Sequence, residues 1–505
     1  MSDAAELASP TTVFVVVSNR TKKIKENSPE NQFIWLIFWQ VYGTIDFIVN
    51  VWRPVVTKNK DILYIIGLLV LSFFAWLPLL DMILRGNGYM YMFTNIQEWF
   101  WNRDYPLTGF SVAAAIAGAF FKNFFGTNIS LYLWTELIVM LFIGTLFYCF
   151  VRVLTKKSVV AFTASLLFTV NYFGHFDMQV NTCYCYFMER VLNVPFLVIS
   201  LIFLHLYLEQ TRLRLYILSL VFFFIGIGLA HFSFLFTPIF FVYPFLWSAI
   251  KKINVKNIFV GLGTSLPYVG ITILFLQLQQ IHEAGFVPRW TLLEFVLDPG
   301  KHLYLSNMLR QLVYWSQYPV VIQTFLDTPF FHQNVLSVSN AVAITPYVVI
   351  AYTIASLVIW YKIPKYRALL LSIIIATAAI FFLNAWFGQY GIANQPGTNR
   401  YLYFPTFLLS LFWALFLWAA FWMKKSSWVV VGGLFLAGYY LINMVLLRDN
   451  FMAVREWNTG TKAIYEHIVN SRDQYNTNTL VLAQYPAINV QEALFLTELI
   501  GRGEV

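Results

Sequence analysis

About eleven apolar runs, most of them long enough to cross a bilayer, alternate with polar connections along this chain. Inside lipid every backbone amide must be hydrogen-bonded within the protein, so such runs form helices. We therefore predict an all-α polytopic membrane protein with about eleven transmembrane helices. The runs cover 62–80, 131–153, 159–173, 191–208, 215–230, 232–250, 258–276, 341–360, 368–385, 401–423 and 428–447.

The connections between these runs are of two kinds. One kind is basic, and the other carries nearly all the loop acids and the long loops. Lys and Arg are retained on the cytoplasmic side of a membrane, so the basic connections and the N-terminus are predicted inside and the long loops and the C-terminus outside. The basic connections are the segments around 152–157, 212–214, 251–256, 362–367 and 424–425.

Composition supports a membrane protein and argues against other classes. The chain is 59% hydrophobic and 11% charged, whereas a soluble domain is about 25% charged. The formal net charge of +9 is mostly retained cytoplasmic charge, so it does not indicate nucleic-acid binding. Three cysteines do not form a disulfide framework. No cleavable signal peptide is visible in the polar N-terminus. The short polar N-terminus and the lack of a retrieval signal favour a bacterial inner membrane over an endoplasmic reticulum membrane.

Three parts are predicted along the chain. Residues 1–61 form a cytoplasmic N-terminus in which 33–51 is an amphipathic helix on the membrane surface. Residues 62–447 form the transmembrane domain, with outer loops at about 81–129 and 277–340, and interfacial helices in the first of these loops. Residues 448–505 form a small α/β element on the outer face, with helices near 453–470 and 490–500 and a strand at 479–483.

The outer end of the first run carries the first candidates for chemistry. Asp81 follows that run directly, and a carboxylate at the water boundary can stay ionised and accept a proton. Arg85 lies in the Gly-containing turn that follows, and Glu98 and Asp104 lie further along the same loop. A polar helix end explains the position of Asp81 as well as a functional role does.

Further ionisable residues lie in or near the later runs. Glu136 is the one acid well inside an apolar run, where a charge is costly and usually faces a cavity or a partner; a protonated packing residue explains it equally well. Arg190 lies on the second outer loop and His231 in the turn between the fifth and sixth runs. Histidine and carboxylates can hold a divalent metal, but no H-x-x-x-H or C-x-x-C spacing is present, so no metal or other cofactor is indicated.

The sharpest local pattern is Gly397-Thr398-Asn399-Arg400-Tyr401-Leu402-Tyr403-Phe404-Pro405-Thr406, which opens the tenth run from outside. The guanidinium of Arg400, at headgroup depth beside Tyr401 and Tyr403, can hold a phosphate with two hydrogen bonds. An aromatic-belt anchor with a snorkelling arginine is the alternative interpretation.

These residues, taken in order, resemble the GT-C superfamily of polytopic glycosyltransferases, nearest in plan to the protein O-mannosyltransferases, TMTC-type enzymes and bacterial family 39. Arg400 to Pro405 is similar to that family's Glu-Arg-x-Leu-Tyr-x-Pro-Ser box, and an acid follows the first span in both. The chain departs from the family in three places: Met82 stands where a second acid is common, and Asn399 and Phe232 each stand where Glu is common. These departures put the donor site and full activity in doubt.

The resemblance implies a function and roles for the candidate residues. A sugar would move, with inversion, from a polyprenyl-phosphate donor to a hydroxyl of a glycan, lipid or protein acceptor on the outer face of the membrane. Asp81 would be the general base. Arg400, Tyr401 and Tyr403 would bind the donor phosphate, helped by His231, Arg85 or Arg190, and Glu98, Asp104 and Glu136 are acceptor or loop candidates.

Three other functions fit parts of the pattern. An O-antigen ligase or polymerase has similar spans and one large outer loop, but typically relies on arginines and a histidine in that loop. A transporter or flippase predicts acids or broken helices at mid-membrane, where Glu136 is the single acid found. A non-catalytic structural member is the third alternative.

Overall fold

The computed structural model describes residues 59–81, 124–125, 129–172, 192–229, 231–251, 255–282, 291–298, 338–386, 403–423 and 428–470. The chain divides into two compact units, Met1–Ile62 and Leu63–Val505, and every contact discussed below lies within the second. Within the described ranges the secondary structure is helical throughout, with no strand. The predicted α/β tail beyond Asn470 and the predicted surface helix at 33–51 lie outside these ranges.

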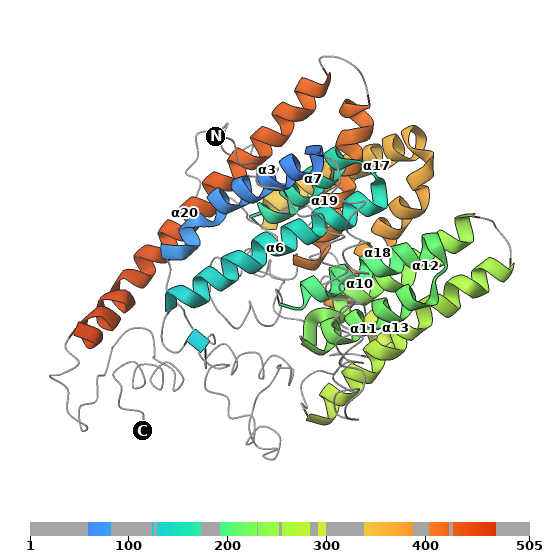
Figure 1. Cartoon of the computed structure of the whole chain (residues 1–505), viewed down its shortest axis with the longest axis horizontal. Helices are drawn as coiled ribbons and strands as arrows, with labels where there is room; N and C mark the ends of the chain where they lie inside the picture. Colours follow the sequence, from blue (N-terminus) through green and yellow to red (C-terminus); the bar gives the residue numbers. More distant parts are fainter. Residues whose placement is uncertain are drawn as a thin grey trace, which may run out of the picture. The chain divides into compact units, whose positions relative to one another are not determined.

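Long apolar sequences form the helices, as expected where lipid leaves the backbone no other partner. In chain order they are α3 (Asn59–Trp76), η1 (Leu77–Asp81), α6 (Ile129–Thr155), α7 (Ser158–Thr169), α10 (Val194–Gln210), α11 (Leu213–Leu229), η5 (His231–Phe236), α12 (Thr237–Lys251), α13 (Val255–His282), α14 (Leu292–Leu297), α17 (Val338–Lys362), η7 (Pro364–Tyr366), α18 (Arg367–Trp386), α19 (Tyr403–Leu417), η9 (Trp418–Trp422) and α20 (Trp428–Asn470) (Figure 1).

Each predicted run coincides with a helix, and the chain is a multi-pass membrane protein. Among the described residues, 7 helical segments are long and apolar enough to cross a membrane. The apolar helices α7, α10 and α11 are shorter than that limit. The 12 residues of α7 reach roughly 18 Å, less than the hydrocarbon thickness of about 30 Å. The full count of about eleven spans therefore stays a prediction.

An aromatic core joins three of the helices. Phe147 of α6 and Phe407 of α19 have ring centroids 4.0 Å apart, and Phe168 of α7 packs against both rings. The ribbons of α6, α7 and α19 run side by side in Figure 1, in agreement with these contacts. Burial of such rings is the main source of packing energy between these helices.

A second group of helices is held by close backbone approach and buried hydroxyls. A Cβ added to Gly226 of α11 would lie 2.8 Å from Leu197 of α10, so only glycine permits this separation. The Ser200 and Ser219 hydroxyls each donate to the other residue's carbonyl, and Ser219 also pairs with the Tyr268 hydroxyl at 2.7 Å. Small residues and hydroxyl pairs of this kind are typical of helix contacts in lipid.

Three of the five basic connections, at 152–157, 212–214 and 362–367, lie at one end of the second unit. Lys156 Nζ pairs with Glu209 at 2.9 Å, and the Tyr366 hydroxyl donates to the Thr155 carbonyl at 2.6 Å. At the same end, Lys365 Nζ lies 6.0 Å from the ring centroid of Trp418 in η9. We call this the basic end and the opposite end the Asp81 end. Which side of the membrane each end faces stays a prediction.

The last described helix differs from the prediction. The helix expected near 453–470 is present, but it is the continuation of α20, which runs unbroken for 43 residues from Trp428 to Asn470. At about 1.5 Å per residue this helix is roughly 64 Å long, about twice the hydrocarbon thickness. No Pro interrupts 428–470, and none of its four glycines, at 432, 433, 438 and 460, lies near 447, so the helix has no local reason to end there.

Candidate functional site at the Asp81 end

Asp81 is the last residue of η1, the short helix that follows α3. Two hydrogen bonds to Thr169 fix the chain just before it: Trp76 Nε1 donates to the Thr169 carbonyl at 2.7 Å, and the Ser72 and Thr169 hydroxyls lie 2.9 Å apart. Beyond Trp76, η1 packs against α6 and α20. The backbone at Asp81 is therefore placed beside the C-terminus of α7 and the N-terminal half of α6.

Glu136 lies on α6 toward this same end. A Cβ on Gly144 would lie 2.5 Å from Thr169 Cγ2, so Gly144 is level with the end of α7. Glu136 is eight residues, about 12 Å, further toward the N-terminus of α6, on the side from which η1 approaches. Its side chain is 1% exposed, and neither carboxylate oxygen has a hydrogen-bond partner in the described part of the chain. An unpaired acid at this depth is costly and points to an interaction outside the described residues.

Tyr403, the first residue of α19, was predicted at headgroup depth beside the donor phosphate. Its side chain is 4% exposed, and its ring lies 5.8 Å from Phe168 and 5.5 Å from Phe404. The ring therefore belongs to the core at the C-terminal end of α7. Contact of Tyr403 with a phosphate stays a prediction.

His231 begins η5, the turn between α11 and α12 where the sequence placed it. The Asn193 amide before α10 donates to the Ser233 hydroxyl, which fixes this turn to α10. Phe236 at the end of η5 packs on Phe404 and Phe407, with centroids 5.1 and 5.7 Å away. The turn that carries His231 is therefore adjacent to the start of α19.

Next to η5 lies a groove of about 660 Å³ between α12, α13 and α18. It is lined by the first turns of α12 and the last turns of α13 and α18, so it lies at the Asp81 end. Its walls are almost wholly hydrocarbon, and two of its polar groups, the Thr237 and Thr272 hydroxyls, bond each other at 2.8 Å. Hydropathy does not predict this groove, because its lining residues come from separate apolar runs. Representative lining residues are Phe234, Pro238, Ile273, Leu276, Phe382 and Trp386.

The structure brings four predicted site residues, Asp81, Glu136, His231 and Tyr403, to elements that meet at one end. The other predicted site residues lie outside the described residues: Arg85, Glu98, Asp104, Arg190, Arg400 and Tyr401. Within the described ranges, no group of three or more His, Cys, Asp or Glu side chains could hold a metal ion. The described side chains at this end therefore provide a buried acid, Glu136, and an apolar groove.

The chain has little similarity in sequence to known proteins. No protein-family model matches the chain. No curated protein matches it either. Among solved structures, the chain is similar to the oligosaccharyltransferase of Archaeoglobus fulgidus, crystallised with Zn and sulfate, at 12% identity and a TM-score of 0.48. The match covers 87% of this chain and 61% of that protein, so this chain spans less than two thirds of its length.

Proposed function

We propose that this protein is a GT-C-type membrane glycosyltransferase, which moves a sugar from a polyprenyl-phosphate donor to an acceptor hydroxyl at the Asp81 end. One observation carries the proposal: the elements that bear Asp81, Glu136, His231 and Tyr403 meet at one end of the helices, beside an apolar groove. The order of motifs that resembles protein O-mannosyltransferases supports it independently.

The groove suits the lipid part of such a donor. Isoprene units carry no polar atoms, and the walls formed by Phe241, Val242 and Leu383 offer them only hydrocarbon. Because a groove of about 660 Å³ falls within the range of ligand pockets, it can take several isoprene units. The donor phosphate would then lie at the η5 end, near His231 and the start of α19.

In the proposed reaction Asp81 is the general base. Its carboxylate takes the proton from the acceptor hydroxyl, and the acceptor oxygen attacks the anomeric carbon of the sugar. The bond from that carbon to the phosphate oxygen breaks, and its electron pair leaves with the polyprenyl phosphate. Attack from the face opposite the leaving group inverts the anomeric configuration.

Leaving-group departure needs positive charge on the phosphate. Arg400 is separated from Tyr403 by only two residues, so its backbone is tethered within about 10 Å of the start of α19. Its guanidinium can donate two hydrogen bonds to phosphate oxygens and so stabilise the charge that develops there. We assign Arg400 the principal phosphate contact and Glu136 a contact to a hydroxyl of the acceptor or sugar.

Glu136 also favours a second function, because a buried acid in a span is typical of proton-coupled transporters. The two functions predict different chemistry. A transporter moves its substrate without breaking a glycosidic bond, so Asp81 would have no role as a base.

The experiment compares Asp81→Asn with the wild-type protein in purified membranes. The probes are synthetic farnesyl-phosphate hexoses and pentoses carrying a radiolabel on the sugar, with release of farnesyl phosphate as a second readout. Loss of a general base lowers the rate by about 10²–10⁴-fold, and we expect this for Asp81→Asn with protein levels unchanged. Glu98→Gln and Asp104→Asn serve as controls on the same loop. Wild-type turnover in Asp81→Asn, with activity lost in either control, would contradict the assignment of the base.

A further inference from the structure

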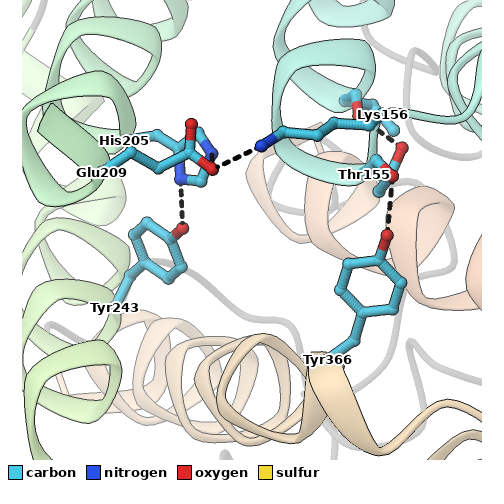
Figure 2. Close-up of polar contacts among 7 residues, drawn as sticks. Thr155, Lys156, His205, Glu209, Tyr243 and Tyr366 are labelled. Atoms are coloured by element: carbon cyan, nitrogen blue, oxygen red, sulfur yellow. Dashed lines mark hydrogen bonds and ion pairs between the residues drawn. The ribbon is translucent and has the colours of Figure 1, made fainter. Parts of the chain in front are cut away.

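The turn between α6 and α7 lies at the basic end, and side chains of neighbouring helices hold it in place. Figure 2 shows two of these contacts: the Tyr366 hydroxyl donates to the Thr155 carbonyl at 2.6 Å, and Lys156 Nζ reaches Glu209 at 2.9 Å. Glu209 in turn lies 3.8 Å from His205 Nε2, and His205 Nδ1 lies 2.7 Å from the Tyr243 hydroxyl. Lys156 itself adopts a left-handed backbone with φ of 57°. The next residue, Lys157, is therefore set in a defined place.

Two exposed lysines meet over one indole ring at this turn. Lys157 Nζ lies 5.8 Å from the ring centroid of Trp418, and Lys365 Nζ lies 6.0 Å from the same centroid. Lys365 also lies over Tyr366 at 4.6 Å, and the Tyr366 and Trp418 rings pack edge to face with centroids 5.9 Å apart. Cation–π contacts thus hold two ammonium groups, from connections far apart in the sequence, around the buried Tyr366 and the half-buried Trp418.

Neither ammonium group has an ion-pair partner among the described residues. The ion pairs of Glu209 are made with Lys156 and His205, and not with Lys157 or Lys365. Glu209 is also the one acid in the segments 152–157, 209–214, 251–256, 362–367 and 424–425. The nearby Arg367 makes its contacts with Trp360 instead of Trp418. Its guanidinium lies 4.8 Å from the centroid of the Trp360 ring, and its Nε donates to the Trp360 carbonyl.

We propose that Lys157, Lys365 and Trp418 form a binding site for the phosphate of an anionic phospholipid at the basic end, separate from the site at the Asp81 end. Two like charges gathered on one ring repel each other unless an anion lies between them. A lipid phosphate suits the place, because tryptophans settle at headgroup depth and basic residues there attract anionic lipids.

Adjacent apolar surface distinguishes a lipid from a free anion. α17 contacts η9, the helix that begins with Trp418. The last two turns of α17, which lead into the connection that carries Lys365, expose Leu357 at 50% and Tyr361 at 73%. An acyl chain whose phosphate sits on the two lysines can lie along this surface, whereas inorganic phosphate gains nothing from it.

The test measures lipid binding to the full-length protein in a neutral detergent. Phosphatidylglycerol, phosphatidylcholine and inorganic phosphate are added separately, and bound molecules are counted by native mass spectrometry while thermal unfolding is followed. We expect phosphatidylglycerol to bind and stabilise the wild type more than either other probe. A lysine near the membrane surface contributes about 5-fold in affinity, so Lys157→Gln with Lys365→Gln should weaken phosphatidylglycerol binding by about 25-fold.

As a control, a second pair of substitutions removes two positive charges elsewhere at the basic end. Lys362 and Arg212 are both exposed, and neither side chain lies over an aromatic ring of the described residues. Lys362→Gln with Arg212→Gln should therefore lose less than about 3-fold. Equal loss in both pairs would show diffuse attraction and overturn the site. Equal stabilisation by inorganic phosphate, or equal binding of phosphatidylcholine, would overturn the lipid assignment. Lys157→Arg keeps the charge and should restore binding if the loss comes from charge and not from misfolding.

Discussion

Trp76 of α3 donates a 2.7 Å hydrogen bond from its indole nitrogen to the backbone carbonyl of Thr169, the last residue of α7. Both residues are about 1% exposed, so the bond is shielded from water. Because Asp81 lies one short helix beyond Trp76, this bond connects the proposed general base to the helix end on which the start of α19 packs.

Replacing Trp76 with Phe should therefore reduce both stability and sugar transfer. The ring stays buried, but a buried carbonyl loses its donor, which costs about 1–3 kcal/mol of unfolding free energy. Thermal unfolding and the farnesyl-phosphate sugar assay measure the two effects. Trp134→Phe is the control, since Trp134 of α6 is 43% exposed. If both variants behave alike, the Trp76 bond does not position Asp81.

Glu136→Leu should make the protein more stable and less active. Leucine removes a buried carboxyl that has no partner in the described residues, and the desolvation penalty disappears with it. A lost hydrogen bond between a carboxylate and a substrate hydroxyl, about 1.5–3 kcal/mol, lowers kcat/KM by about 10- to 150-fold. Met140→Leu, one turn along α6, changes an equally buried side chain without removing a charge. Higher stability with unchanged transfer would make Glu136 a packing residue.

Arg400→Ala should weaken binding of a farnesyl-phosphate sugar by about one to two orders of magnitude, and Arg400→Lys by less. A guanidinium engages two phosphate oxygens, whereas an ammonium acts as a point charge. A hydrogen bond to a charged group contributes roughly 1.5–3 kcal/mol. Donor binding and thermal unfolding are measured on the same two variants. A lower unfolding temperature with unchanged binding would indicate an interfacial anchor and remove Arg400 from the site.

The two ends should face opposite sides of the membrane. Single cysteines replace Gln210 at the basic end and Leu293 on α14, both exposed, in a protein whose Cys183 and Cys185 are changed to Ser. A membrane-impermeant thiol reagent applied to intact cells should label the cysteine at 293 and reach the one at 210 only after permeabilisation. The charge distribution predicts this result. Equal labelling of both in intact cells would overturn the topology.

The positions of the helices could be predicted from hydropathy alone. Each apolar run is a helix because lipid offers the backbone no other hydrogen-bond partner, and Asp81 and His231 lie at the helix ends where the runs placed them. Hydropathy did not predict that α20 continues to Asn470. The last apolar run ends at 447, and the helix near 453–470 is expected from the sequence as a separate element. Polar residues continue a helix as readily as apolar ones once the first turns exist.

Relations between segments were decided by tertiary packing. Nothing local pairs Trp76 with Thr169, places Phe236 against Phe404, or forms the groove between α12, α13 and α18. The sequence by itself determined that helices alternate through a membrane and that basic residues gather in alternate connections, because these follow from transfer of each segment between water and lipid. Which helix ends meet depends on side chains that fit across long separations in the chain. Only the folded structure could therefore assemble the candidate site, and set Lys157 and Lys365 on the same tryptophan.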